Sequence, residues 1–179
     1  MPEPLLPTVL ILASGRGGRF LASGGTPHKL QADLHGRTVL QRTLDAVRAS
    51  GLPWHVEDAG HPGMGDSIAA AVRATGKAQG GWMILPADLP LIRPETLLQI
   101  AQASLVGQVL VPVFERQRGH PVRFALNCRD ALLALKGDQG AVSVVSAYTA
   151  TKLEVNDAGC VTDIDTLNDL IRARLVIRW

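Results

Sequence analysis

The sequence predicts one α/β domain over residues 1–179, Rossmann-like, with a mostly parallel sheet and helices on both of its faces. Short apolar runs alternate along the chain with segments of helical periodicity, which is the pattern of βα units. Hydrophobic residues make up 46% of the 179 residues, enough to build one core for a domain of this size. No repeat, linker or low-complexity segment divides the chain.

Strands are predicted where apolar residues run without interruption. Thr8–Ala13 and Trp82–Leu85 are such runs, typical of strands buried on both faces. Because helical segments separate the strands, parallel pairing is favoured. Further strands are expected at Trp54–Glu57, Gln108–Val113, Pro121–Phe124 and Thr151–Val155.

Helices are predicted where apolar residues recur with helical spacing between capping residues. In Thr38–Ser50 the apolar residues share one face, and Gly51 follows as the C-terminal stop. Further helices are expected at Asp66–Thr75, Arg93–Ser104, Cys128–Leu135, after Gly140, and from Thr166 to about Ile177.

Composition excludes several classes of function. The net charge is +2 and aromatic residues make up 4%, which argues against a surface for nucleic acid. No apolar run reaches the length of a membrane span, and the acidic, proline-rich start MPEPLLPTVL is unlike a secretory signal. The two cysteines, Cys128 and Cys160, form neither a disulfide framework nor a metal set. We therefore expect a cytoplasmic protein with no nucleic-acid or membrane partner.

A glycine-rich loop, Ser14–Gly18, follows the first strand directly. In α/β folds, ligands bind beyond the carboxyl ends of the strands, here after Ala13, Val56, Leu85 and Val113. Glycines there leave amide N–H groups free for phosphate oxygens, although the loop matches neither the Walker nor the dinucleotide fingerprint. A flexible loop is the alternative interpretation.

Two basic residues near this loop point to a triphosphate. Arg19 and Lys29 would neutralise the charge that builds up when a triphosphate is cleaved. Arg16 is interpreted as surface charge. An aspartate between prolines, Asp88 in PADLP, follows the second buried run and suits Mg²⁺, which prefers carboxylate ligands. The alternative is that Asp88 caps the following turn.

Several segments, in order from about Val9 to Leu170, resemble the molybdenum cofactor nucleotidyltransferases. They are LASGRGGRF, with Leu12, Ala13, Gly15 and Arg19; HKL, with Lys29; PGMGDSIAAAV from Pro62; Asp88-Leu89-Pro90; RGHPVRF from Arg118; GDQGA from Gly137; and VTDIDTLNDL from Val161. The resemblance implies a fold like that of the nucleotide-diphospho-sugar transferases, and transfer of a nucleotide from an NTP to the phosphate of molybdopterin.

The resemblance also implies roles for particular residues. Arg19, Lys29 and Asp88 would be catalytic, and Asp88 would hold Mg²⁺, with Asp165 as a further candidate ligand. Gly119, His120 and Pro121 would face the acceptor. The nucleotide would be bound by Leu12, Ala13, Ser14, Gly15, Gly17, Gly18, Gly63, Gly65 and Ser67.

The sequence departs from the family pattern at two places. The stretch between Arg19 and Lys29 is longer than usual, with Ser23–Pro27 as a loop insertion, and Val142 stands where the family has an arginine. We expect a Mg²⁺-dependent nucleotidyltransferase that prefers CTP, because Ala13-Ser14 and the Gly-His-Pro segment resemble the cytidylyl branch. The alternatives are GTP as donor, a sugar or polyol phosphate as acceptor, or a non-catalytic chaperone that delivers the cofactor to a molybdoenzyme.

Overall fold

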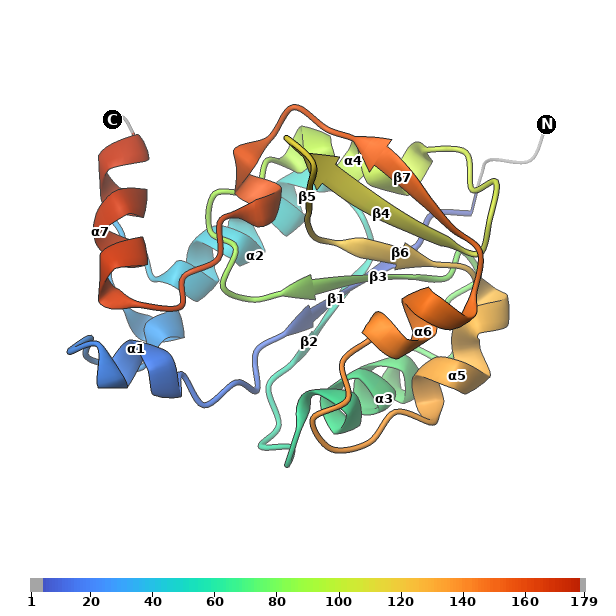
Figure 1. Cartoon of the computed structure of the whole chain (residues 1–179), viewed down its shortest axis with the longest axis horizontal. Coiled ribbons are helices and arrows are strands. Elements are labelled where there is room, and N and C mark those ends of the chain that lie inside the picture. The colour runs from blue at the N-terminus through green and yellow to red at the C-terminus, as the bar shows by residue number, and fades with distance from the viewer. Residues whose placement is uncertain (1–4, 178–179) are drawn as a thin grey trace.

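The computed structural model describes residues 5–177 and confirms the single-domain α/β class. Residues 1–4 and 178–179 of the predicted domain lie outside the described residues. The sheet has the strand order β2-β1-β3-β6-β4, with β5 and β7 also paired to β4 (Figure 1). None of the helices within residues 5–177 has the length and apolar character that a membrane span requires.

The strands lie close to their predicted positions. Strand β1 pairs in parallel with β2 on one side and with β3 on the other, and β4 pairs in parallel with β7. The strands are β1 (Thr8–Leu12), β2 (Trp54–Glu57), β3 (Trp82–Pro86), β4 (Val109–Phe114), β5 (Gln117–Arg118), β6 (Val122–Phe124) and β7 (Ala150–Glu154).

The sheet is mixed, because β6 runs antiparallel to both β3 and β4. Its insertion leaves β4 pointing the same way as β3. The carboxyl ends of β1, β2, β3 and β4 therefore reach the same edge of the sheet, as the predicted site requires.

Helices cover both faces of the sheet (Figure 1). Successive side chains of a strand point to opposite faces. Thus Val9 and Ile11 belong to one core cluster with residues of α2, α4 and α7, whereas Leu10 belongs to the other with residues of α3, α5 and α6. The helices are α1 (Gly18–Ala22), α2 (Val39–Ser50), α3 (Met64–Ala74), α4 (Pro94–Gln102), α5 (Arg129–Leu133), α6 (Val142–Ala147) and α7 (Leu167–Val176).

Short elements near the site were not predicted from the sequence. Helix α1 and the 3₁₀ turn η1 (Lys29–Gln31) follow β1, and η2 (Leu126–Cys128) and η3 (Ala158–Val161) precede α5 and α7. They lack the repeated apolar spacing that marks longer helices. Helix α3 begins at Met64 rather than at Asp66, because Gly63 is its N-cap and the carboxylate of Asp66 accepts a hydrogen bond from a different loop.

Candidate active site

A cavity of about 370 Å³ opens at the edge of the sheet where β1, β2 and β3 end. Leu12 at the end of β1 is paired with Pro86 on one side and Glu57 on the other. The loops after these strands therefore meet. This glycine-loop cavity is lined by Leu12, Ser14, Gly15, Arg16, Lys29, Leu30, His61, Pro62, Gly63, Met64, Ser67, Pro86, Ala87, Asp88 and Asp138.

A second cavity, of about 330 Å³, adjoins the first. The two share Lys29, Met64, Pro86 and Asp88, so these residues mark the junction between them. This His120 cavity is lined by Arg19, Lys29, Met64, Pro86, Asp88, Leu89, Gln117, Arg118, His120, Cys160, Val161, Asp163 and Asp165.

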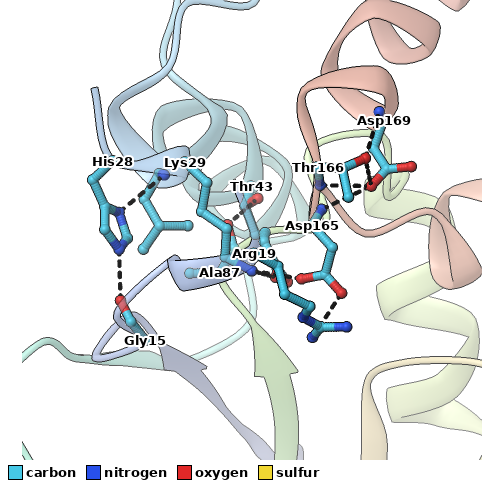
Figure 2. A network of polar contacts seen from close by, with 11 residues as sticks. Gly15, Arg19, His28, Lys29, Thr43, Ala87, Asp165, Thr166 and Asp169 are labelled. Atoms are coloured by element: carbon cyan, nitrogen blue, oxygen red, sulfur yellow. Dashed lines mark hydrogen bonds and ion pairs between the residues drawn. The ribbon is translucent and has the colours of Figure 1, made fainter. Parts of the chain in front are cut away.

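Lys29 links two carboxylates at the junction. Its Nζ lies 2.5 Å from Asp88 Oδ2 and 2.9 Å from Asp165 Oδ1. Arg19 Nη2 lies 2.8 Å from Asp165 Oδ2 (Figure 2). Burial acts to lower the pKa of Lys29, but the charges and hydrogen bonds of the two carboxylates outweigh it and raise the pKa. Lys29 is therefore a cation at neutral pH.

The backbone brings Asp163 and Asp165 to Asp88. The amide of Ile164 donates a hydrogen bond of 2.9 Å to the Asp88 carbonyl, and the Ile164 side chain is fully buried. The aspartates on either side of this anchor point the other way, because alternate residues of an extended segment share a side. The segment then enters α7 through a capping box between Thr166 and Asp169 (Figure 2).

The two neighbouring carboxyls differ in acidity. Burial acts to raise the pKa of Asp165, but Lys29 and Arg19 outweigh it and hold the pKa below its usual value. Burial and the negative charge of Asp165 raise the pKa of Asp163. Adjacent carboxyls with a strong cation on one of them separate in this way.

The three carboxylates fit a divalent cation. One oxygen each from Asp88, Asp163 and Asp165 lies within 4.8 Å of the others. Asp88 Oδ1 is buried and has no hydrogen-bond partner among the described residues, so it retains a lone pair for a ligand. Hard cations such as Mg²⁺ and Mn²⁺ take such oxygen ligands.

The loop that carries Asp88 is held rigidly. The Ala87 amide donates to the Leu12 carbonyl at 3.0 Å, and the Thr43 hydroxyl of α2 donates to the Ala87 carbonyl at 2.8 Å (Figure 2). Leu89 is buried behind it. The backbone next to Asp88 is thus hydrogen-bonded to both the sheet and helix α2, and these contacts fix the position of the Asp88 carboxylate.

The start of α3 is fastened to the loop after Leu135. Gly65 donates its amide hydrogen to the Gly137 carbonyl at 2.8 Å, and Asp66 accepts from the Gly137 amide at 2.9 Å. A Cβ on Gly63 would lie 2.2 Å from the Gly137 carbonyl. These glycines let two loops touch, and Asp138 thereby reaches the rim of the glycine-loop cavity.

A buried glutamate supports the other wall of this cavity. Glu57 accepts hydrogen bonds from the His61 ring at 2.9 Å and the His55 ring at 3.3 Å. Burial acts to raise the pKa of Glu57, but these contacts and the Ala59 amide outweigh it and lower the pKa. His61, which lines the cavity, is therefore held in place by an anion behind it.

His120 is a buried ring on the wall of the second cavity. Its Nδ1 has no hydrogen-bond partner among the described residues. Burial lowers the pKa of His120, which keeps the ring neutral at pH 7. Gly119 packs against the 3₁₀ turn η3, where a Cβ would lie 2.6 Å from the Cys160 carbonyl.

The structure gathers most, but not all, of the residues predicted from the sequence. Leu12, Ser14, Gly15, Lys29, Gly63, Ser67 and Asp88 line the first cavity, and Arg19, Lys29, Asp88, His120 and Asp165 line the second. The predicted residues that line neither cavity are Ala13, Gly17, Gly18, Gly65, Gly119 and Pro121.

Other residues enter the site without having been predicted as site residues. Arg16, interpreted as surface charge, is exposed but also lines the first cavity. Asp163 completes the carboxylate cluster, and its spacing of two residues from Asp165 is the signal that could have identified it. Val142, at the position where the family resemblance leads us to expect an arginine, is 72% exposed and lines neither cavity.

The family of MobA-like NTP transferase domains matches residues 46–152. No curated protein matches the chain.

Solved structures match nearly the whole chain. Rv0371c from Mycobacterium tuberculosis H37Rv has a TM-score of 0.79 at 23% identity, over 97% of this chain and 100% of that one. The structure of Rv0371c in complex with manganese has a TM-score of 0.75 at 21% identity, over 96% of this chain and 100% of that one. Molybdopterin-guanine dinucleotide biosynthesis protein A from Archaeoglobus fulgidus has a TM-score of 0.69 at 18% identity, over 94% of this chain and 97% of that one.

Proposed function

Because the chain belongs to the family of MobA-like NTP transferase domains, we propose that it transfers the nucleotidyl group of CTP to the phosphate of molybdopterin, with Mg²⁺ as cofactor. One observation carries this proposal. The pair of Lys29 and Asp88, 2.5 Å apart, lies where two cavities meet. Such a junction suits a reaction between two bound molecules rather than hydrolysis of one.

The glycine-loop cavity would hold the donor. Ser14, Gly15 and Arg16 of the glycine loop border it, and the side chains of Lys29 and Arg16 add positive charge for a triphosphate. The His120 cavity would hold the acceptor, whose terminal phosphate would approach the junction past Arg19 and Arg118.

The reaction needs orientation and charge neutralisation more than a protein nucleophile. An acceptor phosphate oxygen would attack the α-phosphorus, forming a new P–O bond, while the bond between the α-phosphorus and its bridging oxygen breaks and pyrophosphate leaves. The acceptor phosphate is already ionised, so no general base is required. Lys29 and Arg19 would stabilise the charge that grows on the leaving group.

The carboxylates of Asp88, Asp163 and Asp165 would hold the metal. A metal held there would supply positive charge that offsets the negative charge of the phosphates. The same cluster favours turnover over the chaperone alternative, because a protein that only carries the cofactor needs no metal at a nucleotide site. A molybdoenzyme would then receive the product.

The preference for CTP is supported by the Ala13-Ser14 pair and the Gly119-His120-Pro121 segment, which resemble the cytidylyl branch. GTP is the alternative donor. The experiment that tests both is pyrophosphate release with Mg²⁺ and each of the four NTPs, with and without molybdopterin, with the dinucleotide product identified by mass spectrometry.

A matched pair of variants controls this assay. Asp88→Asn removes a proposed metal ligand. Asp130→Asn makes the same change at an exposed residue near the start of α5. This helix follows β6, whose last residue, Phe124, pairs with Trp82 at the start of β3, whereas Asp88 follows the end of β3. We expect release with CTP only when molybdopterin is present, lost in Asp88→Asn and kept in Asp130→Asn. Release with GTP alone would move the donor to the guanylyl branch. No release of pyrophosphate with any of the four NTPs would contradict turnover with this acceptor.

A further inference from the structure

The loop between Arg19 and Lys29 folds back over the glycine loop. After α1, the amide of Gly25 donates to the Phe20 carbonyl at 3.0 Å. A Cβ on Gly25 would lie 2.3 Å from the buried Phe20 ring, so the loop is packed tightly onto that side chain. The loop is therefore ordered by its own contacts and delivers His28 to a defined position.

The two ring nitrogens of His28 have different partners. Nε2 lies 2.7 Å from the carbonyl oxygen of Gly15, and Nδ1 accepts a hydrogen bond of 3.3 Å from the Leu30 amide (Figure 2). A carbonyl only accepts and an amide N–H only donates. Both contacts are satisfied only by the neutral ring with its proton on Nε2. His28 is also the N-cap of the 3₁₀ turn that begins with Lys29.

Gly17 makes room for this ring. Its φ is +64°, and a Cβ there would lie 2.8 Å from His28 Nε2. By contrast, nothing lies within 4 Å of a Cβ placed on Gly15, which borders the cavity. One glycine of the loop thus accommodates His28, while its neighbour remains open towards a ligand.

We propose that His28 is a positioning residue, which fixes the glycine loop relative to Lys29 so that both grip the same triphosphate. The proposal rests on the proposed function, since it concerns how that donor is held. The His28 side chain joins the glycine loop to the 3₁₀ turn η1. Its Nε2 is hydrogen-bonded to the Gly15 carbonyl, and its Nδ1 caps the turn that carries Lys29.

Two substitutions separate the functions of the ring. Asparagine places an oxygen near the position of Nδ1 and can cap the Leu30 amide, but it is too short to reach Gly15. Glutamine places an N–H near the position of Nε2 and can reach Gly15. The structure therefore predicts that His28→Asn breaks the bond to the loop and that His28→Gln restores it.

The test combines nucleotide binding with a measurement on the free protein. CTP and GTP affinities are measured by calorimetry with Mg²⁺, and amide hydrogen exchange is followed over residues 14–18 without nucleotide. In His28→Asn we expect affinity about fivefold to tenfold weaker and faster exchange in the loop, the size expected for one lost hydrogen bond. In His28→Gln the exchange rate of the loop should return to near the wild-type value, and the affinity should exceed that of His28→Asn, because the bond to Gly15 is kept although the cap on the Leu30 amide is lost.

Other outcomes would overturn the proposal. Wild-type behaviour of His28→Asn in both measurements would show that the bond to Gly15 positions nothing. Loop exchange as fast in His28→Gln as in His28→Asn would show that the bond to Gly15 does not hold the loop. A ¹⁵N spectrum with the proton of His28 on Nδ1 would contradict the hydrogen-bond assignment directly. If the wild-type protein binds no nucleotide, the proposed function fails, and the exchange rates alone decide whether His28 holds the loop.

Discussion

Lys29 and Asp165 are separated by most of the chain, yet Lys29 Nζ lies 2.9 Å from Asp165 Oδ1. The contact joins the turn after the first strand to the segment before the last helix. Asp88 completes it from the end of β3, 2.5 Å from the same nitrogen. Lys29 thus lies between two of the carboxylates that would hold the metal, at the junction of the proposed donor and acceptor cavities.

Asp88→Asn should reduce nucleotidyl transfer by at least about a hundredfold, because it removes a charge from the proposed metal site. The fold should remain, since Lys29 keeps Asp165 as partner. Pyrophosphate release and thermal unfolding measure the two effects. Full activity in this variant would contradict the metal assignment.

Lys29→Ala should raise the KM for the NTP about tenfold or slow the transfer step by a similar factor, because a charge-assisted contact to the triphosphate is lost. Steady-state kinetics separate the two parameters. Lys77→Ala, which removes an exposed lysine that lines neither cavity, is the matched control. Unchanged kinetics in Lys29→Ala would mean that the lysine does not contact the donor.

Gly63→Ala should lower the free energy of unfolding by about 1–3 kcal/mol, because the new methyl group would collide with the Gly137 carbonyl. Gly60→Ala is the control: a Cβ there meets nothing within 4 Å, and we expect a change within about 0.5 kcal/mol. Urea unfolding compares the two. Equal stability of the variants would argue against the close contact of the two loops.

Glu57→Gln should cost about 1 kcal/mol of stability at neutral pH, because an ionised acceptor of two partly buried hydrogen bonds is lost. The folded-state pKa of Glu57 is lowered, so its contribution is present above the unfolded value, about 4.3, and is lost as the pH falls through the folded value. The difference between variant and wild type should therefore shrink below about pH 4. Unfolding across this range measures it, with the exposed Glu154→Gln as control. A difference that does not depend on pH would point to packing instead.

Local patterns in the sequence are sufficient to predict the elements with strong periodicity. The apolar runs of β1 and β3 and the helical face of α2 fall close to their predicted bounds. Asp88 also lies where predicted, at the end of a buried strand. These features depend on local periodicity and on the rule that parallel strands present their carboxyl ends together, so neighbouring residues suffice to predict them.

Which residues contact one another depends on the folded chain and could not be predicted from local patterns. Gly17, which the resemblance assigns to nucleotide binding, accommodates the His28 ring, and Gly65, assigned likewise, donates its amide hydrogen to the Gly137 carbonyl. Asp163 joins the carboxylates because the buried Ile164 is anchored to the Asp88 backbone. Such contacts join segments far apart in the chain, and no local pattern encodes them. A glycine motif indicates a close approach, and only the folded chain decides what approaches.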